Sequence, residues 1–378
     1  MKYRAFPGTR ERVSALGMGC MRLPTREDGS IDRPEAIAMI RHAIDSGVNY
    51  VDTAWGYHGG DSEVLVGEAL RDGYREKTLL ATKLPVWLVE KPSDMREIFE
   101  KQLKRLGLES VDVYHLHALD AARFEKMQKM GALEFLTQLK REGRIRYAGF
   151  SFHDSFDVFQ RILSAYDWDV CQVQMNVVDE FHQATLEGVR LAAQRGIGVI
   201  AMEPLRGGSL SRAVPREIQA LYDAFPIKRS AVEWALRWMI DKEGFCTYLS
   251  GMSNMEQLND NLRIFDSCEA GCLTQEEKKL LTEVREAYER RTPVGCTGCS
   301  YCQPCPQGVK IPEILQAYDR AVIFEDYEKF YTKYFSEPRP SCVGCCACES
   351  VCPQHFQPTI HEHIQRIEQM CQEHRAGK

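Results

Sequence analysis

Short apolar segments alternate with amphipathic segments through residues 1–270 of the chain. NYVDTA (residues 49–54) and TLLATKLP (residues 78–85) have the length and composition of buried strands. The segment 34–46 carries apolar residues at helical spacing, and Gly47 closes it. Strands that alternate with helices pair in parallel, and eight such units predict a closed eight-stranded α/β barrel of the TIM type rather than an open doubly wound sheet.

The rest of the chain divides at changes in this pattern. Residues 1–16 contain a PGT turn and predict a hairpin, and residues 215–225 predict an inserted helix. We expect the barrel to occupy residues 1–270 and a linker helix to follow over residues 271–295. Residues 296–378 then form a small, cysteine-rich helical domain.

The composition is that of a soluble globular protein, with 44% hydrophobic and 27% charged residues. The net charge of −6 and the dispersed positive charges argue against a nucleic-acid partner. The opening MKYRAFPGTR lacks the apolar core of a secretory signal, and no run of about 18 apolar residues predicts a membrane span. We therefore expect a cytoplasmic protein whose 15 cysteines stay reduced.

Four polar residues stand where successive predicted strands meet their loops. Asp52 closes one apolar run, Tyr57 follows five residues later, and Lys83 and His117 end the next two strands. A tyrosine is a weak acid at neutral pH, and a neighbouring lysine is expected to lower its pKa by stabilising the phenolate. Asp52 can fix Lys83, and His117 can donate a hydrogen bond to a carbonyl oxygen, so the four predict proton transfer to a developing alkoxide. The hydride for such a reaction would come from a nicotinamide, although no GxGxxG motif follows the first strand.

The loops after the strands of a closed barrel share one face. Six polar residues are then expected to ring that mouth: Asp52, Lys83, His117, Ser151, Gln172 and Glu203. His115 stands two residues before His117 and faces the same side of its strand. There we expect an internal histidine with a satisfied hydrogen bond.

The barrel region resembles the aldo-keto reductase family over residues 1–268. The matching stretches are VDTAWGY, ATKLP, DVYHLHAL, GRIRYAGFS, QVQMN, EPLRGG and GMSNMEQLNDN. The resemblance implies that Tyr57 is the general acid, Lys83 tunes it, Asp52 holds the lysine and His117 orients the carbonyl. It also implies a small-molecule carbonyl or alcohol substrate, whose identity the sequence does not give.

The resemblance further implies a site for NADP(H) or NAD(H), with several departures from the family pattern. The residues that fall on this site are Ser151, Gln172, Met202, Arg206, Gln257, Asp260 and Asn261. Phe152 replaces the usual asparagine beside the carboxamide serine, and Met202 replaces the stacking tyrosine. No basic residue stands near Gly251 and Gln257, where the family grips a 2′-phosphate, but Arg206 could compensate. The preference between NADP and NAD therefore stays open.

Nine cysteines lie between Cys296 and Cys352 in two runs. Eight of them are candidate metal ligands: Cys296, Cys299, Cys302, Cys305, Cys342, Cys345, Cys348 and Cys352. The second run has the spacing and final Cys-Pro of bacterial 4Fe-4S ferredoxins, and the first departs from it by one residue. The runs predict two 4Fe-4S clusters in a ferredoxin-like domain, which resembles the tail of some aldo-keto reductases. Two four-cysteine zinc sites are the alternative.

The fourth cysteine of each run in two-cluster ferredoxins serves the other cluster. We therefore expect Cys352 to join the first three cysteines of the first run, and Cys305 to join the first three of the second. Cys346 stands between ligands and is expected to be a bystander. The remaining cysteines are expected to be packed or surface thiols: Cys20, Cys171, Cys246, Cys268, Cys272 and Cys371.

Two functions of different classes follow from these features. The first is a nicotinamide-dependent oxidoreductase that interconverts a carbonyl and an alcohol, with Tyr57 as general acid or base. The alternative is an electron-transfer protein whose clusters exchange electrons with a protein partner. In a third view the clusters only hold the C-terminal domain together. The oligomeric state cannot be read from the sequence.

Overall fold

The structure is a computed structural model that describes residues 1–7, 9, 11–211, 214–298, 300–324, 326–336 and 339–376. The chain forms two compact units. The barrel unit comprises Met1–Pro204 and Glu233–Thr274, and the cysteine unit comprises Leu205–Val232 and Gln275–Lys378. The predicted metal ligand Cys299 lies outside the described residues.

Eight parallel strands close into a barrel, which confirms the predicted fold class. They are β3 (Leu16–Gly19), β4 (Tyr50–Asp52), β5 (Leu79–Leu84), β6 (Val111–Leu119), β7 (Ile145–Phe152), β8 (Val170–Gln174), β9 (Gly198–Met202) and β10 (Phe245–Ser250). Neighbours along the chain pair throughout, and β10 returns to β3 to close the ring. The ladder places Lys83 opposite His115, and Ser151 opposite Gln172, so the strands hold their polar ends in a fixed register.

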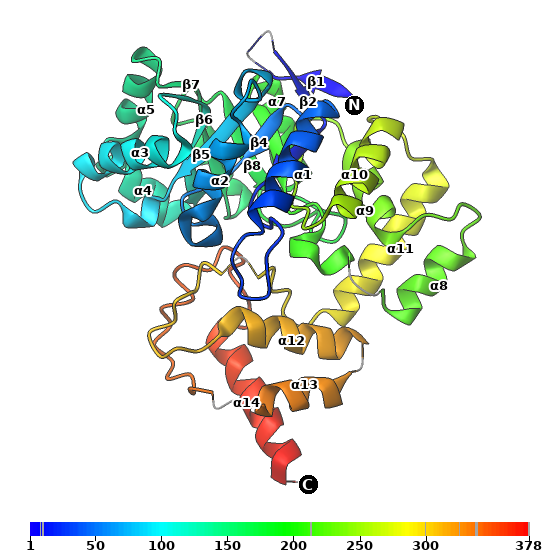
Figure 1. Ribbon diagram of the computed structural model, residues 1–378. Helices are drawn as coiled ribbons and strands as arrows, with labels where there is room; N and C mark the ends of the chain where they lie inside the picture. Colours follow the sequence, from blue (N-terminus) through cyan, green and yellow to red (C-terminus); the bar gives the residue numbers. More distant parts are fainter. Residues whose placement is uncertain are drawn as a thin grey trace. The chain divides into compact units, whose positions relative to one another are not determined.

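Amphipathic helices surround the strands (Figure 1). They are α1 (Arg33–Asp45), α2 (Asp61–Ala69), α3 (Pro92–Leu106), α4 (Ala121–Lys129), α5 (Ala132–Arg141), α6 (Phe156–Leu163), α7 (Thr185–Gln194), α9 (Ala231–Asp241) and α10 (Met255–Ser267). In α5 the buried residues Ala132, Phe135, Leu136 and Leu139 recur at helical spacing and form one apolar stripe. Asp32 caps α1 and Asn254 caps α10 through side-chain hydrogen bonds, which fixes where each helix begins.

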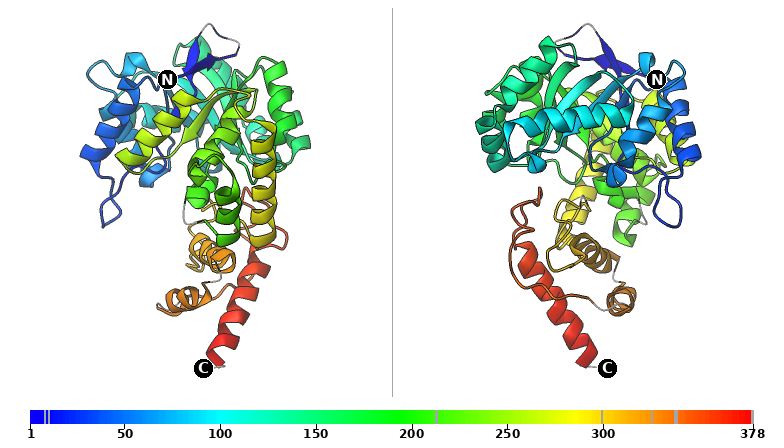
Figure 2. Two further views of the ribbon diagram at one scale, coloured as in Figure 1. Left: turned by 90° about the vertical axis from the view of Figure 1, so that its right-hand side faces the viewer. Right: turned by 60° about the vertical axis from the view of Figure 1, so that its left-hand side comes forward.

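The predicted N-terminal hairpin forms from β1 (Tyr3–Ala5) and β2 (Arg12–Ser14), which pair antiparallel. The hairpin lies across one end of the barrel (Figure 2). Phe6 and Val13 are fully buried and pack in one cluster with Tyr50, Ala81 and other residues of the barrel interior. Because the hairpin covers one end, the carboxyl ends of the strands are left to carry the site.

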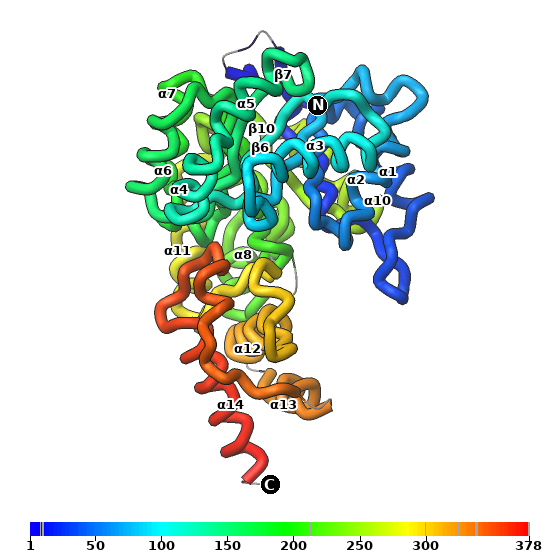
Figure 3. Tube along the Cα trace, turned by 90° about the vertical axis from the view of Figure 1, so that its left-hand side faces the viewer, coloured from blue at the N-terminus to red at the C-terminus, as the bar shows by residue number. Residues whose placement is uncertain are grey.

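The cysteine unit is helical outside its two cysteine runs. Its helices are α8 (Arg216–Ala224), α11 (Gln275–Arg291), α12 (Ile311–Phe324), α13 (Tyr327–Phe335) and α14 (Ile360–Ala376). Glu217 of α8 pairs with Arg290 and Arg291 of α11. Helix α12 packs against α13 and α14, as Figure 3 shows, around a core that includes Ile314 and Ile364. The segment between the two cysteine runs therefore contains two helices, α12 and α13.

Two further findings concern predictions made from the sequence. Cys268 and Cys272 are joined by a disulfide, so the expectation of two thiols at these positions is wrong. In the described part of the chain, no helix has both the length and the hydropathy that crossing a membrane requires.

Candidate active site

Lys83 is the centre of a buried ion pair at the end of β5. Its Nζ lies 2.6 Å from Oδ1 of Asp52 and donates to the carbonyl oxygen of Thr53 at 2.9 Å. A further hydrogen bond of 3.3 Å joins Nζ to the hydroxyl of Tyr57, which begins the 3-10 turn η1 (Tyr57–Gly60). Gln172 donates from Nε2 to Oδ2 of Asp52 at 2.7 Å. The structure thus brings three of the four predicted catalytic residues into direct contact.

His117 completes the group from β6. Its ring centroid lies 6.2 Å from that of Tyr57, with the rings nearly perpendicular, and 5.1 Å from that of Trp87. Trp87 belongs to the 3-10 turn η3 (Val86–Leu88) and remains partly exposed. The rings of Trp87 and Tyr57 therefore both lie beside the His117 imidazole at the barrel mouth.

Burial sets the protonation states of this group. It raises the pKa of the Tyr57 phenol well above its ordinary value, and the carboxylates of Asp52 and Glu203 act in the same direction. The expectation that Lys83 gives Tyr57 a lowered pKa is therefore wrong, because the cost of burying the phenolate dominates. Burial, followed by the charge of Lys83, holds the pKa of His117 well below its ordinary value. At neutral pH both side chains are uncharged, and Tyr57 keeps the proton that a general acid needs.

Asp52 is held as a carboxylate by its neighbours. Burial raises its pKa, while the Lys83 ammonium and the Gln172 amide stabilise the charged form. The ion pair costs desolvation on both sides, which these additional hydrogen bonds offset. The pair therefore carries charge in a site from which water is largely excluded.

The alternation of β5 explains how Lys83 is aimed into the barrel. Its neighbour Thr82 faces the other way and donates to buried Glu63 at 2.7 Å. Gln102 of α3 donates to the carbonyl oxygen of Lys83 at 3.0 Å and to Glu63 at 2.7 Å. Arg105 pairs with Glu63 at 3.0 Å. This network outside the barrel fixes the backbone from which Lys83 reaches inward.

His115 lies two residues before His117 on β6. It is fully buried, and neither ring nitrogen forms a hydrogen bond with another described residue. The expected satisfied hydrogen bond is therefore absent from the described part of the chain. Burial and the nearby Lys83 charge keep its pKa well below the ordinary value, so the ring is neutral.

Three of the predicted cofactor residues stand at the carboxyl ends of strands. Ser151 is near the end of β7, Gln172 lies opposite it on β8, and Met202 ends β9. The Ser151 hydroxyl accepts a hydrogen bond of 2.7 Å from the backbone of Ala118 and keeps its own proton to donate. These residues share the barrel end that carries Asp52.

The three predicted residues around α10 have partners within the barrel unit. Gln257 accepts from the backbone N–H of Ser253 at 2.9 Å, and Asp260 pairs with Arg263 at 2.8 Å. Asn261 is buried and donates to Ser250 Oγ at 2.9 Å. They therefore also shape the loop after β10.

Arg206 belongs to the cysteine unit. A Cβ atom on Gly295 would lie 2.7 Å from its Nη2 atom, so the guanidinium packs directly on that glycine. Its charge also lowers the pKa of the buried Asp319, although burial leaves that pKa raised overall. Its surroundings within this unit are therefore those of the loop that leads into the first cysteine run.

Sequence reasoning did not single out two residues at the barrel mouth. Trp87 follows β5 in the stretch PVWLV, which reads as ordinary apolar sequence. Arg22 follows β3 in CMRLP and is half-buried. Its charge lowers the pKa of Tyr57 against the stronger effect of burial, which places it near the catalytic group. In the sequence, Arg22 is marked only by its positive charge directly after a predicted strand.

The cysteines of the second unit line two cavities. A cavity of about 240 Å³ is lined by Cys302, Cys305, Cys342, Cys345, Cys346 and Cys348. A smaller one is lined by Cys296, Cys302 and Cys352. Burial raises the pKa of Cys296 to about 12, and the neighbouring thiols of Cys302 and Cys352 add to the rise. The larger cavity thus includes the four cysteines expected for one set together with Cys302 and Cys346, and the smaller includes three of those expected for the other.

The described residues contain no group of three or more histidine, cysteine or acidic side chains in an arrangement that holds a metal ion. Cys299 lies outside these described residues. His361 lies beside the second run, with its Nδ1 atom 3.3 Å from the sulfur of Cys342. Cysteine thiolates can bind iron or zinc, but the described residues do not show a metal-binding geometry.

Residues 15–286 match the Aldo/keto reductase family. A probable aldo-keto reductase 1 from Glycine max is 30% identical over 204 residues, which cover 52% of this chain and 57% of that protein, little more than half its length. An NADH-specific methylglyoxal reductase from Escherichia coli (strain K12) is 27% identical over 305 residues, 70% of this chain and 91% of that protein. The holo form of an aldo-keto reductase from Bacillus halodurans has a similar structure, with a TM-score of 0.64, 27% identity, and coverage of 75% of this chain and 96% of that one.

The family match covers well over half of the chain and includes Asp52, Tyr57, Lys83 and His117. It favours an enzyme over the electron-transfer alternative, because the matched residues are those of a reductase family and include the four predicted catalytic residues. The chain therefore belongs to the aldo/keto reductase family.

Proposed function

We propose that this protein reduces a small carbonyl compound to an alcohol, or catalyses the reverse reaction, with Tyr57 as the general acid or base. As a member of the aldo/keto reductase family, the chain is an NAD(P)-dependent oxidoreductase. The observation that carries the proposal is the direct hydrogen bonding of Tyr57, Lys83 and Asp52 at the barrel mouth. When bound, the nicotinamide supplies a hydride to the carbonyl carbon.

Tyr57 supplies the proton that the reduced oxygen needs. Its raised pKa keeps the phenol protonated before the reaction, and the phenolate forms 3.3 Å from the Lys83 ammonium once the proton leaves. Asp52 and the Thr53 carbonyl oxygen hold that ammonium in place, so the charge meets a preorganised cation. The same contacts let the phenolate take a proton back in the oxidation direction.

His117 orients the carbonyl. Its low pKa keeps the imidazole neutral, so it can donate a hydrogen bond to the carbonyl oxygen without adding a second cation beside Lys83. Trp87 and the Tyr57 ring bound the same space and favour a compact organic substrate.

We assign the nicotinamide dinucleotide to residues in or at the ends of β7, β8 and β9 and to residues of α10, the helix that follows β10. These are Ser151, Gln172, Met202, Gln257, Asp260 and Asn261. Ser151 and Gln172 face each other across neighbouring strands, beside Asp52, and suit a carboxamide. The sequence also predicts Arg206 for this site; it belongs to the cysteine unit, and its role stays a prediction.

The replacement Tyr57→Phe tests the proposal. It keeps the ring and removes the transferable proton, so we expect kcat/KM for carbonyl reduction to fall roughly 10²–10⁴-fold. A panel of small aldehydes and ketones that includes methylglyoxal, the compound in the name of the E. coli relative, would supply the substrate. Nicotinamide affinity should stay within about threefold, and Tyr74→Phe, the same change at a tyrosine that bonds Asp45, should keep full activity. Full turnover by Tyr57→Phe would contradict the proposal.

We further propose that residues 296–378 form a ferredoxin-like domain with two 4Fe-4S clusters, joined to the barrel by the linker 271–295. Cys296, Cys299, Cys302 and Cys352 would hold one cluster, and Cys305, Cys342, Cys345 and Cys348 the other. The two cavities support this grouping, because each is lined mainly by one of the sets. Such clusters need reduced cysteines to load, which fits the cytoplasmic location predicted from the sequence.

Neighbouring residues Cys345 and Cys346 provide a matched test of the clusters. Both side chains are exposed, but only Cys345 belongs to a predicted ligand set. After anaerobic purification, Cys345→Ser should lower iron and sulfide from roughly eight to roughly four atoms per chain, while Cys346→Ser should match the wild type. Bound zinc without iron would favour two zinc sites, and equal effects of the two changes would contradict the grouping.

A further inference from the structure

We propose that Arg22 binds the pyrophosphate of the nicotinamide dinucleotide and supplies the positive charge that the loop after β10 lacks. This inference rests on the proposed function, because it needs a dinucleotide at the barrel mouth. The inference is based on the position of Arg22, which lies between the turn that contains Tyr57 and the loop after β10.

The backbone of Arg22 is fixed from two sides. Ser253, in the loop after β10, donates from Oγ to the Arg22 carbonyl oxygen at 3.0 Å. On the other side the N–H of Leu23 donates to Nε2 of His58 at 3.2 Å, and His58 follows Tyr57 in η1. Arg22 therefore stands on a segment that is tied both to the catalytic turn and to the last loop of the barrel.

The side chain of Arg22 packs on Gly251. A Cβ atom on that glycine would lie 3.3 Å from Cβ and 3.4 Å from Cγ of Arg22. The glycine thus lets the aliphatic stem lie flat against the loop after β10, with the guanidinium carried beyond it. Packing of the stem on this glycine helps to set the position of the charge.

The Arg22 guanidinium forms no hydrogen bond or ion pair with any residue that the structure describes, in contrast to many arginines of this unit. Arg105 pairs with Glu63, and Arg41 pairs with Asp72. A half-buried guanidinium without a protein partner gains most from an anionic ligand. In α/β barrels the loops after the seventh and eighth strands, here β9 and β10, frequently form a phosphate site.

The order of the groups along the dinucleotide favours the pyrophosphate over the 2′-phosphate as the group that Arg22 binds. The carbon that gives up the hydride must lie beside the carbonyl that Tyr57 protonates. The pyrophosphate is one ribose away from the nicotinamide ring, whereas the 2′-phosphate of NADP is at the adenosine end. Arg22 is near enough to Tyr57 for its charge to act on the phenol, which suits the nearer group.

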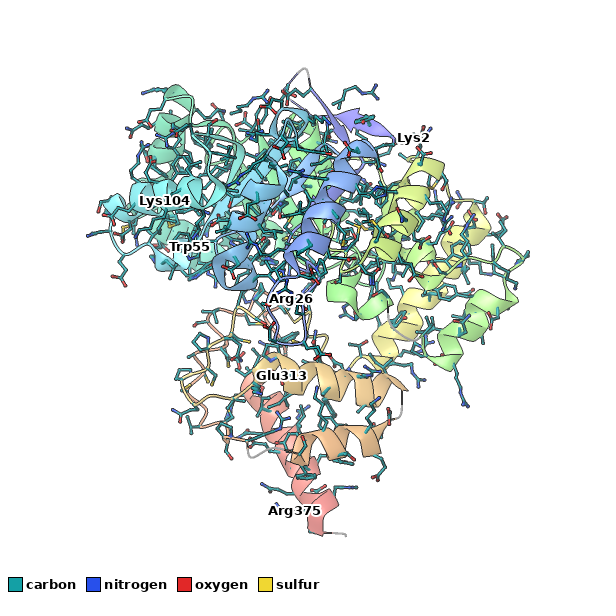
Figure 4. All side chains as sticks on the ribbon, in the orientation of Figure 1. Lys2, Arg26, Trp55, Lys104, Glu313 and Arg375 are labelled. Carbon is teal, nitrogen blue, oxygen red and sulfur yellow. A yellow bond between two sulfur atoms is a disulfide. The ribbon has the colours of Figure 1, made fainter. Side chains whose placement is uncertain are left out.

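The test replaces Arg22 by methionine, which keeps the stem against Gly251 and removes the charge. Dissociation constants for NADH and NADPH would be measured without substrate, by quenching of tryptophan fluorescence. We expect the dissociation constants for NADH and NADPH to rise by the same factor, roughly 10–100-fold, because one charge-assisted hydrogen-bonded pair is lost. The dissociation constants of Arg22→Lys should lie between those of the wild type and of Arg22→Met. Arg26→Met is the control, since Arg26 is an exposed arginine further along the same loop between β3 and α1 (Figure 4).

Three results would overturn the inference. Weaker binding of NADPH alone would assign Arg22 to the 2′-phosphate, and unchanged binding of both would leave it outside the cofactor site. Unchanged binding with a higher KM for carboxylate-bearing carbonyl compounds would assign it to the substrate. A wild-type protein that binds neither nucleotide would instead overturn the proposed function, so the two failures are distinguishable. Equal melting temperatures would show that the variants fold alike.

Discussion

The two units hold their reactive side chains in opposite ways. In the barrel, Lys83 has a carboxylate at 2.6 Å, a carbonyl oxygen at 2.9 Å and a phenol at 3.3 Å. In the cysteine unit, thiols from two irregular segments line cavities, and the described residues include no convergent metal-binding group. The polar groups of the barrel site bind one another, whereas the thiols of the cysteine unit line cavities.

The difference follows from where the residues stand in the fold. Strand pairing fixes the register of the barrel, so a polar residue at a strand end has a defined neighbour on the next strand. The cysteines lie in loops whose backbone hydrogen bonds are few and local. A ligand that binds the thiolates would order those loops, as structural metals do. We therefore expect the barrel site to be rigid by itself and the cysteine loops to depend on what they bind.

The largest effect is expected when the buried ion pair of the barrel is broken. Asp52→Asn removes the partner of a fully buried ammonium, which should destabilise the protein by roughly 3–5 kcal/mol and lower kcat/KM by roughly 10²-fold or more. Urea titrations and initial rates would measure the two effects. Asp45→Asn is the control, because Asp45 and its partner Lys77 are both more than half exposed and 3.4 Å apart. That change should cost under about 1 kcal/mol. A mild effect of Asp52→Asn would mean that the ion pair does not hold the site.

A smaller effect is expected from removing iron under the proposed cluster assignment. Anaerobic chelation should strongly increase hydrogen exchange in residues 296–308 and 342–358, which carry the cysteine runs. Exchange in β5 and β6 should be unchanged, and kcat for carbonyl reduction should stay within about twofold, since the hydrogen bonds of the catalytic group lie within the barrel unit. A loss of turnover in proportion to the lost iron would contradict this independence.

The smallest effect concerns acid stability. Burial lowers the folded pKa of His115 below the ordinary value of 6.5, so its neutral form stabilises the fold above about pH 6.5. That stability is lost as the pH falls from 6.5 toward the lowered pKa, with a slope of about 1.4 kcal/mol per pH unit for one such group. His115→Leu should flatten the decline measured by urea titrations from pH 7 to 5. His42→Leu, at an exposed position, should leave it unchanged. The same slope in wild type and His115→Leu would contradict the assignment.

The barrel and its catalytic group could be predicted because both depend on regular spacing. Strand–helix alternation places Asp52, Lys83 and His117 at strand ends, and closure of the ring brings them together. The raised pKa of Tyr57 could not be predicted, since it comes mainly from burial, which depends on residues from several strands. The disulfide between Cys268 and Cys272 was missed because close spacing alone does not show that two cysteines meet.

Arg22 and Trp87 could not be found from periodicity, because each lies in an irregular loop after a strand. Their places depend on contacts with distant residues, such as Gly251 for Arg22 and His117 for Trp87. The cysteine runs show the opposite limit. Their spacing predicts metal ligands directly, but under the proposed cluster assignment the arrangement of the sulfurs depends on the group that binds them.

The most direct test of hydride transfer at the barrel site uses NADH or NADPH that carries deuterium at the transferring C4 position. Wild-type protein and Tyr57→Phe would be incubated anaerobically with the same carbonyl substrate, and the alcohol product analysed by mass spectrometry. We predict one deuterium on the carbinol carbon of the wild-type product and product formation slowed at least 100-fold in the variant. An unlabelled product, or equal rates for the two proteins, would contradict hydride transfer with Tyr57 as the proton donor.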